Sequence, residues 1–107
     1  MPSEVIVRYP ILVKKDYLET VEQAWTNISA ELSELGVLKG WLVKDDTMPI
    51  YACLEWQDTE CWQQFRQYGQ NPISKLTGEL DKGILYGYYD PIEPTATSRR
   101  NQTVFRL

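Results

Sequence analysis

Histidine is absent from this chain of 107 residues, and cysteine occurs only twice, as Cys53 and Cys61. Without histidine the chain lacks the commonest general base, so Ser-His-Asp and Cys-His catalytic arrangements cannot form within it. Zinc sites built from cysteine and histidine are excluded for the same reason. Two cysteines in a protein that we expect to be cytoplasmic favour free thiols that pack as small hydrophobic groups. We therefore predict neither a metal site nor another cofactor, and no disulfide.

Long apolar runs and clustered positive charges are also lacking. No stretch approaches the about 20 apolar residues that a membrane-spanning helix needs, and the N-terminal stretch does not read as a signal peptide. The formal net charge is -4, and basic residues pair only at Lys14-Lys15 and Arg99-Arg100. A phosphate-binding surface needs more positive charge than this. The sequence thus predicts a cytoplasmic protein that binds neither membranes nor nucleic acid.

The first half of the chain predicts a strand followed by a helix. Val5 to Val13 is apolar and rich in branched residues, which is typical of a strand, and Pro10 predicts irregularity there. Asp16 to Leu35 carries one apolar stripe at helical spacing. Asp16 is the expected N-terminal cap of this helix, and Gly36 is the expected stop.

The middle of the chain predicts a hairpin and a second helical region. Val37 to Lys44 and Ile50 to Trp56 are strand-like and are separated by a short polar turn, so we expect them to pair antiparallel. Asp58 or Thr59 can begin the next helix. Because proline suits the first turn of a helix, Pro72 to Leu80 is expected to form a separate helical piece.

Gly83 to Tyr89 is the predicted fourth strand, in which alternation would place Tyr86 and Tyr88 on one face. The order strand-helix-strand-strand-helix-strand is that of an α+β, ferredoxin-like fold with an antiparallel sheet covered by helices on one face. The first and third strands carry one charged residue each, Arg8 and Glu55, so the second face is apolar as well. Such a sheet predicts a homodimer that pairs through this face.

The chain is expected to hold one domain, residues 1–91, and a C-terminal tail, residues 92–107. Thr103 to Leu107 has the composition of a short strand. The tail is therefore predicted to pack as an arm, either on its own domain or on a dimer partner.

The strand that ends Leu54-Glu55-Trp56, followed by an aromatic helix, resembles the antibiotic biosynthesis monooxygenase (ABM) domain family of the dimeric α+β barrel superfamily. The resemblance covers about residues 5 to 90. It implies a homodimer whose two sheets face each other as a barrel, with a pocket between helices and sheet in each subunit. It also implies one of several activities, among them cofactor-independent oxidation of quinone-like or polyketide aromatics and the degradation of haem.

Haem degradation is the implied activity that the residues exclude. Relatives with this activity use an asparagine in the first strand, a tryptophan in the second helix and an axial histidine further along. The corresponding positions here are Arg8, Phe65 and the neighbourhood of Lys75. Since all three differ and no histidine is present to bind iron, the chain is not expected to degrade haem.

Two functions remain open at this point. The first is a cofactor-independent, monooxygenase-like activity on an aromatic or quinone-like small molecule, and the second is a non-catalytic small-molecule-binding or assembly module of the same fold. Core packing alone would explain most of the aromatic residues, and Arg8 would either pair with Glu55 or a dimer partner, or anchor an anionic substrate oxygen. If a substrate pocket exists, its candidate residues are Arg8, Trp25, Trp62, Phe65, Tyr68, Asn71 and Tyr86.

Overall fold

A computed structural model describes residues 5–69 and 71–92 of the chain. Its elements are β1 (Val5–Val13), η1 (Lys15–Tyr17), α1 (Leu18–Glu31), η2 (Leu32–Leu35), β2 (Val37–Val43), β3 (Ile50–Trp56), α2 (Thr59–Gln67), α3 (Pro72–Glu79) and β4 (Leu85–Tyr88). Apart from Ile92, the predicted C-terminal arm and its short strand Thr103–Leu107 lie outside the described residues.

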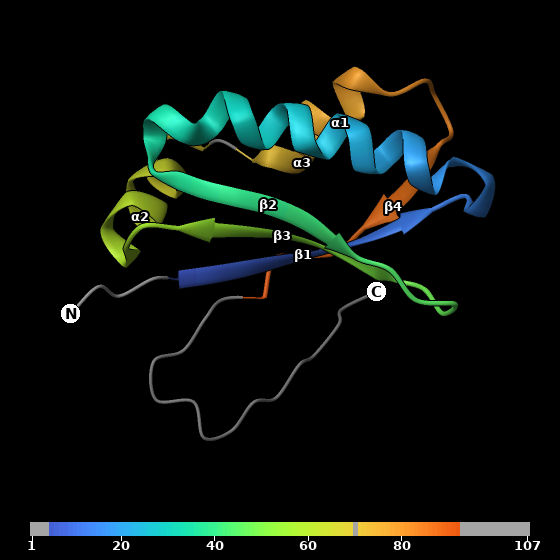
Figure 1. The fold of residues 1–107 in the computed structure, drawn as a ribbon, viewed down its shortest axis with the longest axis horizontal. Coiled ribbons are helices and arrows are strands. Elements are labelled where there is room, and N and C mark those ends of the chain that lie inside the picture. Colours follow the sequence, from blue (N-terminus) through green and yellow to red (C-terminus); the bar gives the residue numbers. More distant parts are fainter. Residues whose placement is uncertain (1–4, 70, 93–107) are drawn as a thin grey trace.

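The strands form one antiparallel sheet in the order β2-β3-β1-β4, and the helices pack against one of its faces (Figure 1). This is the ferredoxin-like α+β fold that the sequence predicts. The third strand has the predicted bounds, and its Ile50, Ala52, Leu54 and Trp56 are buried against the helices. Because side chains alternate along a strand, the other residues of β3 face the opposite side of the sheet.

β1 lies inside the sheet although it contains Pro10. Its pairing with β3 is continuous from Val5 to Ile11, and the irregularity falls on the β4 side, between Leu12 and Val13. The carbonyls of Arg8 and Pro10 accept hydrogen bonds from the N–H groups of Ile92 and Tyr89, which follow β4. Because backbone direction alternates along a strand, the even-numbered residues of β1 direct their N–H and C=O groups toward the β4 side. Proline is tolerated because its missing N–H would point toward the irregular side.

Two details of the predicted elements are wrong. Asp16 does not cap the first helix, because it lies within the 3-10 turn η1, and α1 begins at Leu18 without a side-chain cap. The second wrong detail is the regular alternation expected in β4, which the irregularity between Leu12 and Val13 of β1 interrupts. Leu85 lies opposite Val13 and Tyr88 lies opposite Ile11, so both occur on the helix side of the sheet.

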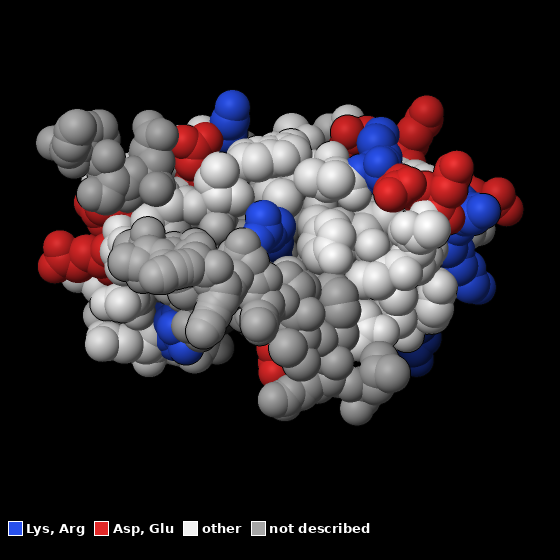
Figure 2. Space-filling model, turned by 90° about the horizontal axis from the view of Figure 1, so that it is seen from below, with Lys and Arg blue, Asp and Glu red and all other residues white. Residues whose placement is uncertain are grey.

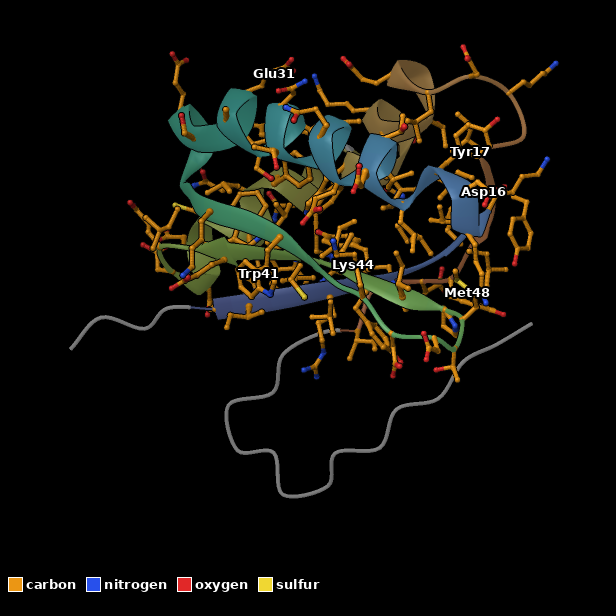
Figure 3. All side chains as sticks on the ribbon, turned by 45° about the vertical axis from the view of Figure 1, so that its right-hand side comes forward. Asp16, Tyr17, Glu31, Trp41, Lys44 and Met48 are labelled. Carbon is orange, nitrogen blue, oxygen red and sulfur yellow. The ribbon has the colours of Figure 1, made fainter. Side chains whose placement is uncertain are left out.

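α1 packs very closely on β2. The indole N–H of Trp25 donates to the backbone carbonyl of Cys53 at 3.1 Å, which ties the helix to the middle of the sheet. A Cβ atom added to Gly40 in β2 would lie 2.9 Å from the Ser29 Cβ and 3.0 Å from the Leu54 Cδ2. At the end of β2, the Lys44 ammonium lies 2.9 Å from the Glu22 carboxylate of α1 (Figure 3).

The face of the sheet opposite the helices carries apolar side chains. Tyr51, Cys53 and Glu55 alternate with the four β3 residues that face the helices, so they lie on this face. Cross-strand neighbours share a face, so Val43, Trp41 and Ile6, which pair with them in that order, lie there as well. Seen from below, the part of this face that Figure 2 shows is largely uncharged, with one basic group near its middle and most other acidic and basic groups toward its two ends. We call this surface the open face.

Replacing Gly40 by alanine is expected to destabilise the fold, because the new methyl group would push α1 away from β2. Overpacking of this kind costs about 1–3 kcal/mol, measurable as a lower free energy of unfolding in urea. Gly78 provides a matched control, since a Cβ there meets no atom within 4 Å, and its replacement by alanine should be neutral or stabilising. Equal effects of G40A and G78A would contradict the close contact.

Candidate functional site

α2 presents one face toward the neighbouring turn η2. The helix begins at the side chain of Asp58, whose carboxylate accepts a hydrogen bond from the Cys61 backbone N–H at 2.8 Å. This confirms the predicted cap. Downstream, Cys61, Gln64, Phe65 and Tyr68 follow at spacings of three and four, so they line the same side of the helix.

These four side chains and Leu35 form a shallow groove with a volume of about 80 Å³. Phe65 is buried and forms its inner wall, with its ring centroid 5.1 Å from that of Trp56. Tyr68 is 78% exposed, although it carries a large aromatic ring. The groove therefore combines one rigid aromatic wall with one exposed aromatic side chain, and no charged side chain of the described residues lines it.

Cys61 gives the groove a thiol in its neutral form. Its pKa is raised by partial burial and, in addition, by the carboxylates of Asp58 and Glu60. The amide of Gln57 lies 3.6 Å from the sulfur, and Gly36 packs so closely that a Cβ there would lie 2.8 Å from it. A neutral thiol donates a weak hydrogen bond but is a poor nucleophile.

A second aromatic group fills the layer between the helices and the sheet. The rings of Tyr9 and Trp25 lie 6.1 Å apart, and the Arg66 guanidinium lies 4.9 Å from the ring of Trp62. Burial raises the pKa of Tyr9 well above its ordinary value, although a hydrogen bond with the Trp62 side chain and the charge of Arg66 oppose this rise. The phenol is therefore a neutral group with no general-base character.

The structure divides the predicted pocket residues into separate groups. Phe65 and Tyr68 meet at the groove, whereas Trp25 and Trp62 are buried in the layer just described. The Asn71 side chain accepts a hydrogen bond from the Ile73 N–H at 2.9 Å and so caps α3. The remaining two, Arg8 and Tyr86, lie on β1 and β4 and do not line the groove.

Arg8 lies opposite Cys53 on the open face. Within residues 5–69 and 71–92, the salt bridges join Lys44 to Glu22 and Lys75 to Glu31, so the expected pair between Arg8 and Glu55 is not formed there. Burial raises the pKa of Cys53 to about 11, and the nearby Arg8 guanidinium partly offsets this rise. Both cysteines are free thiols.

Sequence reasoning missed Leu35, Cys61 and Gln64 as groove residues. The helical spacing of Cys61 and Gln64 relative to Phe65 and Tyr68 was a usable signal. Leu35 has no such signal, because it belongs to the apolar stripe of the first helical region and becomes exposed only where that region ends beside α2.

The described part of the chain has neither a metal-binding cluster nor a membrane-spanning helix. It contains no group of three or more histidine, cysteine, aspartate or glutamate side chains that could hold a metal ion. None of its helices has the length and apolar character needed to cross a bilayer.

Similarity to known proteins is limited to solved structures, since no protein-family model and no curated protein matches the chain. One similar crystal structure is a conserved protein of unknown function from Bacteroides thetaiotaomicron, described as a possible oxidoreductase; its TM-score is 0.53 at 16% identity, over 85% of this chain and 97% of that one. Another is a dimeric ferredoxin-like protein from an uncultured marine organism, with a TM-score of 0.54 at 14% identity, over 96% and 95% of the two chains. These values show a shared ferredoxin-like fold, and the ABM resemblance stays a prediction.

Replacing Asp58 by asparagine is expected to make Cys61 more reactive. Asparagine also caps helices, so α2 should persist, while loss of the carboxylate charge lowers the Cys61 pKa toward its ordinary value. The rate of Cys61 alkylation by iodoacetamide at pH 8 should rise about threefold or more. Cys53 is only 2% exposed and serves as the internal unreacted control. An unchanged or lower rate in D58N would show that Asp58 does not restrain the thiol.

Proposed function

We propose that this chain is a binding module for small, planar, uncharged aromatic molecules, which it holds in the groove beside α2. The observation that carries the proposal is Tyr68, whose ring is 78% exposed at the mouth of a groove backed by Phe65. A ligand ring seated between them would bury apolar surface, each Å² being worth about 25 cal/mol. Aromatic pairs in offset or tilted contact add about 0.5–1.5 kcal/mol.

The polar groups of the groove define the ligand class further. The Gln64 amide can both donate and accept a hydrogen bond, and the neutral Cys61 thiol can donate a weak one. With no charged side chain in the lining, an ionised ligand would gain little there to offset its loss of hydration. Phenols and quinones, which carry a hydroxyl or carbonyl on a planar ring, fit these features.

Cofactor-independent oxidation is the second candidate function, favoured by the ABM resemblance and by the possible oxidoreductase among the similar structures. In such a reaction a bound phenolate would supply the electrons and molecular oxygen would be the oxidant. The groove lining offers no base for removing the phenol proton, since its only ionisable groups are the Cys61 thiol, whose pKa is raised, and the Tyr68 phenol. Oxidation would thus be confined to substrates acidic enough to ionise by themselves, which is why binding is the better-supported function.

We also propose that the chain works as a homodimer joined through the open face. Ile6 and Val43 are each 45% exposed on that face, beside Trp41 and Tyr51. Apolar side chains in the middle of a sheet are better covered by a second sheet than by water, and a two-fold dimer provides this with one surface. The dimeric ferredoxin-like protein among the similar structures supports self-association.

Ligand binding can be tested with 2-naphthol and 1,4-naphthoquinone as probes, measured by quenching of tryptophan fluorescence. Replacing Tyr68 by alanine should raise the dissociation constant at least about fivefold, because one wall of the groove is lost. Tyr86, which is 57% exposed on β4, is the matched control, and Y86A should bind as the parent chain does. Equal affinities of Y68A and the parent, or no quenching at all, would exclude the groove.

Oxygen uptake with any bound phenol separates the two candidate functions. Binding without oxygen consumption above the rate of the free phenol supports the binding module. Consumption that is lost in Y68A would instead establish the oxidation.

The dimer can be tested by replacing Val43 with lysine, which would place an unpaired charge in the interface. The dimer dissociation constant should rise at least about tenfold, as measured by sedimentation equilibrium. Tyr17 has a similar exposure, 42%, but belongs to η1 beside Asp16 and not to the sheet (Figure 3). Y17K should therefore leave the association unchanged. A monomeric parent chain, or equal association of both variants, would refute pairing through the open face.

A further inference from the structure

The outer edge of β1 is only partly occupied by other strands. β4 pairs with it at Ile11, Leu12 and Val13, and one isolated bridge joins Arg8 to Ile92. Among the described residues, no strand pairs with Val5–Val7 on that side, whereas β3 pairs with all three on the other (Figure 1). Such an edge exposes backbone donors and acceptors that can pair with an added strand.

The free backbone groups at this edge can be identified from the hydrogen bonds beside it. The carbonyls of Arg8 and Pro10 accept from the N–H groups of Ile92 and Tyr89, at 2.8 and 3.0 Å. Because backbone direction alternates along a strand, Ile6 turns its N–H and C=O toward the same outer side, and Val7 turns them toward β3. Among the described residues, the Ile6 N–H and C=O therefore have no partner on that side, and the Ile6 side chain is 45% exposed on the open face.

The chain reaches this edge just where its described part ends. Extending the antiparallel register of Arg8 and Ile92 by two residues would place Pro94 opposite Ile6. Proline has no N–H, so it cannot donate to the Ile6 carbonyl, and the direct continuation leaves that acceptor unpaired. A later segment of residues 93–107 is better suited to the position.

Thr103–Leu107, with the sequence TVFRL, is that segment. Its branched and aromatic residues favour a strand, and alternation gives Phe105 and Leu107 the same side. Residues 93–107 also contain three arginines and a single acidic residue, Glu93. Of the chain's 15 acidic and 11 basic residues, all except Glu4, Glu93 and these three arginines lie in the described part, which is therefore net acidic. The two parts have opposite net charge, which favours their association.

We propose that Thr103–Leu107 pairs with the outer edge of β1 at Val5–Val7 of the same chain, as a fifth strand. Residues 95–102 provide ample length for the return, since extended chain spans about 3.3 Å per residue. The added strand satisfies the free groups of Ile6 and lays Phe105 and Leu107 beside its exposed side chain. It also closes an edge that would otherwise be open to pairing with other proteins.

Residue-resolved amide hydrogen exchange by NMR tests this proposal in the full chain. The Ile6 amide should be protected in the parent. Replacing Phe105 by proline should accelerate its exchange at least about tenfold, because in an antiparallel pair the residue beside Ile6 donates its N–H to the Ile6 carbonyl, and proline has no N–H. The matched control is Thr97→Pro, outside the segment, which should leave Ile6 unchanged. The Val7 amide faces β3 and should keep its protection in all three proteins.

Two results would overturn the proposal. One is an Ile6 amide that exchanges at the unprotected rate in the parent, or at the same rate in parent and F105P. The other comes from mixing isotope-labelled F105P with unlabelled parent chain. If labelled Ile6 regains protection, the strand is donated by a second copy and not by the same chain.

Discussion

The close contact between α1 and the sheet constrains the rest of the structure. Gly40 allows the helix to approach β2 until Ser29 touches the strand, and Trp25 reaches past it to the carbonyl of Cys53. With the helix held so near, the space above the sheet is occupied by tryptophan and tyrosine rings. α3 packs beside α1, and α2 lies at one end of the sheet, in contact with β3 (Figure 1).

This close packing bears on function. The aromatic side chains that suggest a cofactor or substrate box are largely employed in filling the interior, and the pKa of Tyr9 is raised by the same burial. The side chains left for a ligand are those at the periphery, where α2 meets η2. There Phe65 stacks inward on Trp56 while Tyr68 remains exposed. Binding in a shallow aromatic groove needs fewer functional groups than catalysis in a closed pocket, because binding involves no proton transfer.

The open face exposes apolar side chains, and the outer edge of β1 exposes backbone groups. Both favour association with a further segment of chain. The open face has the alternation of a buried sheet, but none of the described helices lies above it, and a second copy of the chain is the simplest cover. No strand of the described residues pairs with the outer edge of β1 at Val5–Val7, and the chain itself leads back toward it at Ile92. A fifth strand and a dimer interface are compatible, because one uses the edge and the other the face.

The sequence alone determined the order and type of the elements. Ile50–Trp56 and the cap at Asp58 follow from local alternation and local hydrogen bonding, which depend on residues only a few positions apart. Phe65 and Tyr68 were predicted as site residues for the same reason, since helical spacing is local. The tertiary structure alone decided that Leu35 joins them, because that contact spans two elements that are distant in sequence. It also decided which side of the sheet the residues of β4 face, because one irregularity beside β1 changes the register of every residue beyond it.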